Sequence, residues 1–279
     1  MDPASALIVF REVLEAALVV GIVMAGSKGV AGRGLWVGGG VLGGVLGACV
    51  VAAFAGVIQN AAAGVGQELL NAGILFGAVA MLAWHCVWMG RHGRDIARHM
   101  SAVSREVVQG SRPLYALGIV VGLAVLREGS EVVLFLYGIA AGGSAGATAM
   151  LGGGVVGLAG GAAVGVAIYA GLMRIPMRYL FAVTTWMIIL LAAGMASQGA
   201  GFLVQADLLP AFGHSLWDTS GILSERSIPG RVLHTLVGYD ARPSGIQLLF
   251  YVTTLLLIGS LTWILGRTNS PAAPAARAA

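Results

Sequence analysis

Residues 125–138, "VLREGSEVVLFLYG", set one arginine and two glutamates inside a run that is otherwise apolar. The whole chain is poor in charge: 58% of its 279 residues are hydrophobic, 10% are charged, and the mean hydropathy is +0.89. This composition is typical of a membrane protein and lies far outside the range of soluble domains. Ionisable residues inside a membrane span are costly, so these three charges are the first candidates for function.

Seven stretches of the chain are long and apolar enough to cross a bilayer as helices, which takes about 20 residues. They lack the alternation of apolar and polar residues that is typical of membrane-spanning strands. We therefore expect an all-α polytopic membrane protein, because helices satisfy their own backbone hydrogen bonds in lipid. The expected spans are at about 4–25, 36–58, 67–90, 114–141, 148–172, 179–201 and 244–266.

The lysines and arginines between the spans predict the orientation of the chain. Eleven fall in the connections on one side and three in those on the other, while Arg11 and Arg127 lie within spans. By the positive-inside rule the richer side is cytoplasmic, so the N-terminus faces out and the C-terminus in. The basic charge, with a pI of about 9.4, thus indicates membrane topology and no nucleic-acid partner. The localisation that follows is the plasma membrane, which is the inner membrane of a bacterium.

The connections differ in length and character. Residues 91–112 are expected to form a basic cytoplasmic loop, and residues 202–243 a longer outer segment. The Pro/Ala-rich residues 267–279 are expected to be a disordered cytoplasmic tail. Residues 1–266 are therefore expected to form a single transmembrane domain. The outer segment carries these acids and histidines: Asp207, His214, Asp218, Glu225, His234 and Asp240.

An internal repeat relates the first three expected spans to the next three. "FREVLEAAL" at 10–18 matches "LREGSEVVL" at 126–134, and "GGGVLG" at 38–43 matches "GGGVVG" at 152–157. Repeat 1 covers about 4–90 and repeat 2 about 114–201. Three spans in each copy would insert the second copy upside down, as in many transporters. The two charged motifs would then face each other on antiparallel helices.

The charged motifs can form a carboxylate cluster, because residues three and four positions apart share one face of a helix. Two arginines against four glutamates leave a formal charge of −2, which a cation could balance. Carboxylate oxygens suit hard or borderline cations such as Mg, Ca, Mn and ferric iron. The members of the cluster are Arg11, Glu12, Glu15, Arg127, Glu128 and Glu131.

Other polar residues in the spans are weaker candidates. Glu68 adds a carboxylate near the outer start of the third span, and Asn71 lies one turn further on. His85 could bind a metal, but we interpret it as a packing or gate histidine. Asp218 could meet an incoming ion or fold the outer segment. The cysteines, Cys49 and Cys86, lack the spacing of a zinc or disulfide motif.

Two other functions remain open from the residues alone. Paired glutamates in a membrane can also relay protons, or serve a proton-coupled transporter of another divalent metal such as lead or manganese. An intramembrane enzyme is the third class, and the chain has no H-E-x-x-H, G-x-S-x-G or Walker motif. We therefore predict a transporter and no enzyme.

At these residues the chain resembles the oxidase-dependent iron transporter family, the high-affinity iron permeases of fungi and their bacterial counterparts in three-component uptake systems. The shared feature is R-E-x-x-E in the first and fourth of seven spans. "VWMGRHGRDI" at 87–96 and "LWDTSGILSERSIPGRVLHTLVGYDARPSGIQLLFY" at 216–251 are also similar to the family's segments, so the resemblance covers nearly the whole chain.

The resemblance implies a function for each matching residue. Glu12, Glu15, Glu128 and Glu131 would translocate iron, ferrous or ferric, with the two arginines as charge partners. Iron would be the substrate, and no resident cofactor is implied. A periplasmic or extracellular iron-binding, ferroxidase or peroxidase protein would be the partner. Family members often carry a second acid one turn into the third span, and this chain has Asn71 there, which leaves Glu68 alone.

Overall fold

The computed structural model describes the chain from residue 1 to residue 267, except for 63–65, 144–145, 172–176, 214 and 225–226. The described residues are helical with connecting turns and contain no strand, which confirms the all-α prediction. The expected tail, 267–279, lies outside the described residues apart from Arg267. The helices are α1 (Pro3–Gly26), α2 (Arg33–Ala62), α3 (Gln67–Val108), α4 (Tyr115–Ala141), α5 (Ala147–Tyr169), α6 (Met177–Gln205), α7 (Ile228–Val237) and α8 (Gly245–Arg267).

Among the described residues, five helices are long and apolar enough to cross a membrane: α2, α3, α5, α6 and α8. The other two expected spans coincide with α1 and α4, which are 24 and 27 residues long. Each of these two helices is long enough to cross a membrane, but the arginine and two glutamates that it carries make its composition less apolar.

The start of α1 is fixed by its first residues. The Asp2 carboxylate accepts a hydrogen bond from the Ser5 backbone N–H at 2.7 Å, and Pro3 occupies the first helical position, where no N–H is needed. The backbone N–H of Asp2 also donates to the Ala149 carbonyl of α5 at 2.8 Å. The beginnings of α1 and α5 are therefore tied together.

The prediction of a loop at 91–112 was wrong for most of that segment, because α3 continues as a helix to Val108. At 1.5 Å per residue its 42 residues span about 63 Å, roughly twice the hydrocarbon thickness of a bilayer. Val103 and Val107 in this extension are buried, and Val107 belongs to a hydrophobic cluster with Leu117 of α4. Charged residues lowered the hydropathy of the segment, but this buried apolar side keeps it helical.

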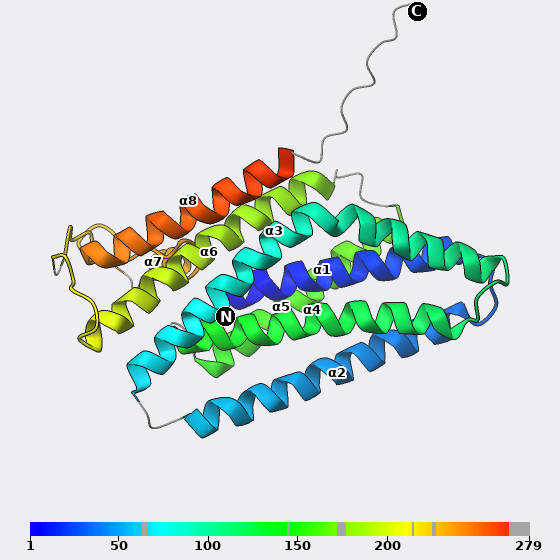
Figure 1. The fold of residues 1–279 in the computed structure, drawn as a ribbon, viewed down its shortest axis with the longest axis horizontal. Coiled ribbons are helices and arrows are strands. Elements are labelled where there is room, and N and C mark those ends of the chain that lie inside the picture. The colour runs from blue at the N-terminus through cyan, green and yellow to red at the C-terminus, as the bar shows by residue number, and fades with distance from the viewer. Residues whose placement is uncertain (63–65, 144–145, 172–176, 214, 225–226, 268–279) are drawn as a thin grey trace, which may run out of the picture.

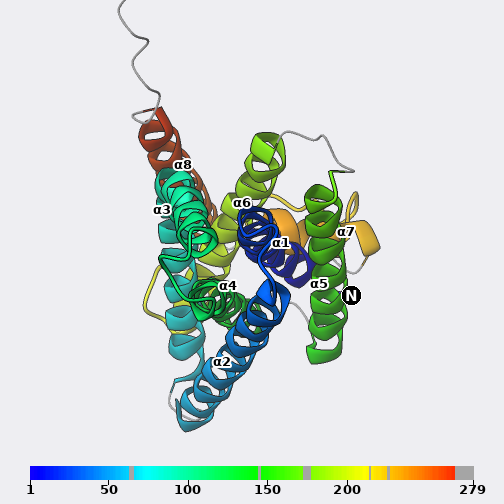
Figure 2. The same cartoon turned by 90° about the vertical axis from the view of Figure 1, so that its right-hand side faces the viewer.

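The helices run antiparallel to their neighbours along the chain, and α1 and α4 occupy the middle of the bundle in opposite directions (Figures 1 and 2). The most extensive packing joins α1 to α5 and α2 to α4. Thus α1 of the first expected repeat packs on α5 of the second, and α4 of the second packs on α2 of the first. This exchange brings the two charged motifs side by side.

Glycines make both of these crossings close. A Cβ on Gly44 of α2 would lie 2.7 Å from the Gly122 carbonyl oxygen of α4, and one on Gly157 of α5 would overlap the Ala6 carbonyl oxygen of α1. Gly122 lies 116 positions after Ala6, the same offset that separates Arg127 from Arg11. The two crossings are therefore made by matching residues.

The second contact of each crossing gives the same offset. A Cβ on Gly40 would overlap the Gly118 carbonyl oxygen, and one on Gly153 would overlap the Asp2 carbonyl oxygen, again 116 positions apart. The contacts thus match Gly40 with Gly153, whereas the match of "GGGVLG" to "GGGVVG" aligned Gly40 with Gly154. The structural correspondence is therefore shifted by one residue from the sequence match, because the crossing of two helices decides which glycine meets which carbonyl.

Enlarging a glycine at a crossing is expected to separate the helices. Gly44→Ala should lower the melting temperature of the detergent-solubilised protein, since overpacking typically costs about 1–3 kcal/mol. Gly43→Ala is the matched control, because nothing lies within 4 Å of a Cβ at that position on the same helix. Equal melting temperatures for the two variants would show that the α2–α4 crossing does not need the glycine.

Candidate metal site

The first charged motif is buried in α1. Arg11, Glu12 and Glu15 are 2%, 0% and 5% exposed. The Arg11 guanidinium lies 3.1 Å from Glu15 Oε1 and 3.5 Å from Glu12 Oε1, so one arginine serves two carboxylates. The pairing with Glu15 is within ion-pair distance, but the Arg11 Nε–H is not aligned for a hydrogen bond. The pair therefore balances charge without satisfying every donor and acceptor.

The second motif, in α4, has the same internal pairing but a more open arginine. Arg127 Nε donates to Glu131 Oε1 at 3.1 Å and lies 3.9 Å from Glu128 Oε1. The Arg127 side chain is 34% exposed and stacks over the Trp88 ring, with its guanidinium carbon 4.0 Å from the ring centroid. The two motifs thus match in sequence but differ in their surroundings.

His85 of α3 joins the two motifs. Its Nδ1 is hydrogen bonded to Glu131 Oε2, and its Nε2 lies 3.8 Å from Glu15 Oε1 and 4.0 Å from Glu12 Oε1. The imidazole is 2% exposed and meets the Phe135 ring edge-on, with centroids 6.2 Å apart. The interpretation of His85 as a packing or gate histidine did not anticipate its position between both pairs of carboxylates.

The four glutamates and His85 form two overlapping groups that could each hold a metal ion. Within each group the ligand atoms lie within 4.8 Å of one another, and Glu12 belongs to both. One group is Glu12, Glu15 and Glu128, and the other is Glu12, His85 and Glu131.

Several polar atoms of this cluster lack hydrogen-bond partners among the described residues. Buried polar groups are normally paired, so a concentration of unpaired atoms at one place requires an explanation. A cation would supply one, because it would coordinate the carboxylate oxygens and the His85 nitrogen that now face one another. The unpaired atoms are Arg11 Nε, Glu12 Oε2, Glu15 Oε2, His85 Nε2 and Glu128 Oε2.

Apolar layers lie on both sides of the cluster along α1 and α4. Ile8 and Phe135 belong to one buried layer, next to the start of α1 and the end of α4. Val23 and Val121 belong to the other layer, toward the opposite ends of these helices. Buried apolar side chains therefore follow the cluster toward both ends of α1 and α4.

Two hollows reach the cluster from the side. A cavity of about 330 Å³ is lined by Met81, Trp84, His85, Trp88, Arg127 and Glu131. A groove of about 870 Å³ between the α1–α5 and α2–α4 pairs has Glu12 and Glu128 among its lining residues, and its other walls are almost entirely apolar. The smaller cavity is the more polar of the two, because it contains an arginine, a histidine and a glutamate.

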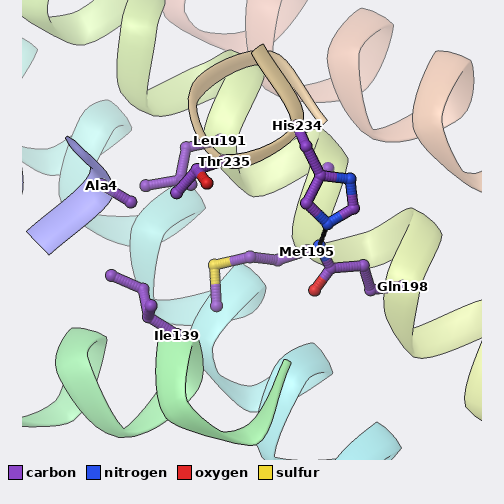
Figure 3. Close-up of a pocket in the computed structure, with 8 residues that line it drawn as sticks. Ala4, Ile139, Leu191, Met195, Gln198, His234 and Thr235 are labelled. Carbon is purple, nitrogen blue, oxygen red and sulfur yellow. Dashed lines mark hydrogen bonds between the residues drawn. The ribbon is translucent and has the colours of Figure 1, made fainter. Parts of the chain in front are cut away.

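A third, water-sized hollow lies beyond the Ile8 and Phe135 layer. Figure 3 shows Ala4, Ile139 and Met195 below α7, with the His234 ring facing Gln198. His234 Nδ1 donates to the Tyr239 carbonyl, a 2.6 Å contact that also holds α7 in place. Ile139 follows Glu131 by eight residues, so this hollow is about 12 Å from the cluster along α4.

The weaker sequence candidates in the third span are distant from the cluster. Glu68 is exposed in the first turn of α3, and Asn71 is half-buried one turn on. Glu68 precedes His85 by 17 residues, which is about 26 Å along the helix. The structure therefore brings the six motif residues and His85 together. Glu68 and Asn71 lie apart from them.

Asp218 is also remote, in the exposed part of the outer segment. Its carboxylate accepts hydrogen bonds from the Ser220 backbone N–H and hydroxyl, and it pairs with Arg242 at 3.0 Å. The Ser220 hydrogen bonds and the Arg242 charge lower the pKa of Asp218 to about 2. Its charge is thus balanced within the segment, an arrangement that favours the structural role. His214 and Glu225 lie outside the described residues.

The fold and the cluster define a class of protein: a helical membrane protein with a buried cluster of carboxylates. Comparison with known proteins is specific. A model of the iron permease FTR1 family matches residues 4–267. The ferrous iron permease EfeU of Yersinia pestis is 31% identical over 275 residues, which cover 97% of this chain and 96% of that protein.

A second relative agrees with the first. The ferrous iron permease EfeU of Escherichia coli O6:K15:H31 (strain 536 / UPEC) is 32% identical over 243 residues, covering 85% of this chain and 87% of that protein. No solved structure matches the chain. The chain belongs to the iron permease FTR1 family, which confirms the resemblance seen in the motifs. It is a transporter with transmembrane helices and not an enzyme.

Proposed function

We propose that this chain carries iron ions across the plasma membrane, a bacterial inner membrane, into the cytoplasm through the cluster of Glu12, Glu15, Glu128 and Glu131. The observation that carries the proposal is the set of buried carboxylate oxygens without partners at the centre of the bundle. The printed names of the relatives, ferrous iron permeases, support a divalent ion. So does the formal charge of −2 left by the two arginines and four glutamates.

Seven membrane spans, α1 to α6 and α8, accommodate this function, in a single permease domain over residues 1–266. The N-terminus faces out, as the positive-inside rule predicts. The matching glycine contacts at a constant offset of 116 positions support two inverted repeats of three helices each, about 4–90 and 114–201. In this arrangement α1 and α4 cross the membrane with their charges facing each other, which avoids exposing them to lipid.

The hollows divide between the two sides of the cluster in this orientation. The water-sized hollow below α7 lies on the outer side, where Ile8 and Phe135 close the path to the cluster. The cavity lined by Trp88 and Arg127 lies on the cytoplasmic side, since α3 runs inward past His85. An ion would leave toward this cavity, which Arg127 and Glu131 line. Rocking of one repeat against the other would open the two sides in turn.

An extracytoplasmic protein would deliver the ion. The partner expected from the family is a periplasmic or extracellular iron-binding protein, ferroxidase or peroxidase. Glu68 faces the outer side in this orientation and is exposed, so it is available to an arriving ion.

Iron uptake by the full chain in proteoliposomes tests the function. Radioactive iron-55, kept ferrous with ascorbate, is expected to accumulate in vesicles with the protein and not in matched empty vesicles. A pH-sensitive dye inside the vesicles reports proton movement in the same experiment. Proton flux without iron would favour the proton relay, and uptake of manganese or lead without iron would favour another metal. Either result would overturn the proposal.

A further inference from the structure

His85 is the one described side chain outside the two charged motifs that belongs to a metal-binding group of the cluster. Its two ring nitrogens have different surroundings. Nδ1 is held by Glu131, whereas Nε2 is buried, has no hydrogen-bond partner and faces Glu12 and Glu15. A histidine kept only for packing normally has both nitrogens paired. The free Nε2 among carboxylates therefore points to a ligand.

The distances around Nε2 fit a shared ion better than direct hydrogen bonds. Its separations of 3.8 Å from Glu15 Oε1 and 4.0 Å from Glu12 Oε1 are too long for a hydrogen bond. Two ligand atoms that are each about 2.1 Å from one metal ion lie up to about 4.2 Å apart. An ion can therefore sit between Nε2 and these carboxylates with little movement of the side chains.

We propose that His85 Nε2 binds the transported ion directly and that Glu131 acts through His85, by orienting the imidazole. Histidines that bind metals almost always donate their other ring N–H to a carboxylate or carbonyl, and Glu131 occupies that position. Glu131 is in turn fixed by Arg127 at 3.1 Å. The inference rests on the proposed function and assigns ligands of the same site: His85 Nε2 together with Glu12 and Glu15, which form a group with Glu128.

This assignment makes the site asymmetric although the repeats match. The helix that corresponds to α3 in the second repeat is α6, which has no Asp, Glu, His, Lys or Arg between Phe181 and Gln205. One nitrogen ligand among oxygens changes the substrate class. Imidazole suits transition metals such as Fe²⁺, whereas all-oxygen sites suit Mg²⁺ and Ca²⁺. His85 would therefore let the site take Fe²⁺ in the presence of more abundant Mg²⁺.

Electron spin-echo spectroscopy of bound Mn²⁺ tests the ligand directly in the purified full-length protein. Nitrogen-14 modulation from an imidazole is expected in the wild type and should vanish in His85→Gln. His99→Gln is the matched control, because His99 is an exposed histidine on the same helix. Modulation that persists in His85→Gln, or is missing from the wild type, would overturn the assignment.

Competition during uptake tests the substrate class. His85→Gln is expected to take up Fe²⁺ about tenfold more slowly than the wild type and to be inhibited by excess Mg²⁺, since loss of metal-site partners typically costs about 10–100-fold. Fe²⁺ uptake by the variant that remains fast and insensitive to Mg²⁺ would refute the inference and leave iron transport standing. A wild type that takes up no iron would refute the proposed function, and the Mn²⁺ spectrum would still decide the ligand.

Discussion

Glu12→Gln is expected to reduce iron uptake by about 100-fold or more, at the upper end of the loss typical when groups of a metal site are removed. Glu12 is fully buried and is the residue that both metal-binding groups share. Its Oε2 has no hydrogen-bond partner among the described residues. The amide of glutamine has nearly the same shape but no charge, so the change removes ion binding while the packing is kept.

The measurement is the initial rate of iron-55 uptake into proteoliposomes with equal amounts of protein. Glu106→Gln is the matched control, since Glu106 is a partly exposed glutamate that pairs with Arg112 at the end of α3, far along the chain from both motifs. Size-exclusion profiles of the solubilised variants should match the wild type. Uptake by Glu12→Gln at the rate of Glu106→Gln would refute a route through the cluster.

The sequence predicted the helices and the cluster well because the signals are strong in a membrane. An apolar run of about 20 residues has few alternatives to a helix. Charges are costly enough in lipid that Arg11 and Arg127 stand out without any structure. The helix period then places Glu12 and Glu15 near Arg11, and the repeat predicts that the second motif lies close by. These inferences depend on local patterns, which one sequence contains.

The position of His85 between the two charged motifs could not be predicted in the same way. Its neighbours in the chain, Trp84 and Cys86, give no sign that carboxylates from α1 and α4 surround it. The signal that was available is the cost of placing a histidine within an apolar span, which indicates function by the same reasoning as for the motifs. His85 was expected near the cytoplasmic end of a span at 67–90, which argued against a site there. The helix α3 in fact continues to Val108.

The helical extension of α3 and the register of the glycines were missed for related reasons. Charges at 91–105 lower the mean hydropathy, yet an amphipathic helix continues wherever one side can be buried, as at Val103 and Val107. Which glycine meets which carbonyl is a property of the crossing between two helices. A pattern within one helix, such as three successive glycines, does not define it.

Arg11→Met is expected to destabilise the protein strongly, by about 3–5 kcal/mol, because removing one partner of a buried pair leaves an unbalanced buried charge. Arg11 is enclosed and is the arginine that contacts Glu12 and Glu15. The expected result is a large fall in the melting temperature measured in detergent. The matched variant is Arg127→Met at the equivalent position of the second charged motif.

The two arginines should differ because their surroundings differ. Arg127 is 34% exposed toward the cavity, where water can solvate the carboxylates that lose the arginine. Its stack on Trp88 contributes about 0.5–2 kcal/mol. We therefore expect Arg127→Met to lower the melting temperature much less. A divalent ion should partly restore the melting temperature of Arg11→Met, since Mn²⁺ can supply the positive charge that the substitution removes from beside the carboxylates. Equal losses for the two variants, with no recovery on adding Mn²⁺, would mean that the arginines are structural and that the carboxylates are not arranged for a cation.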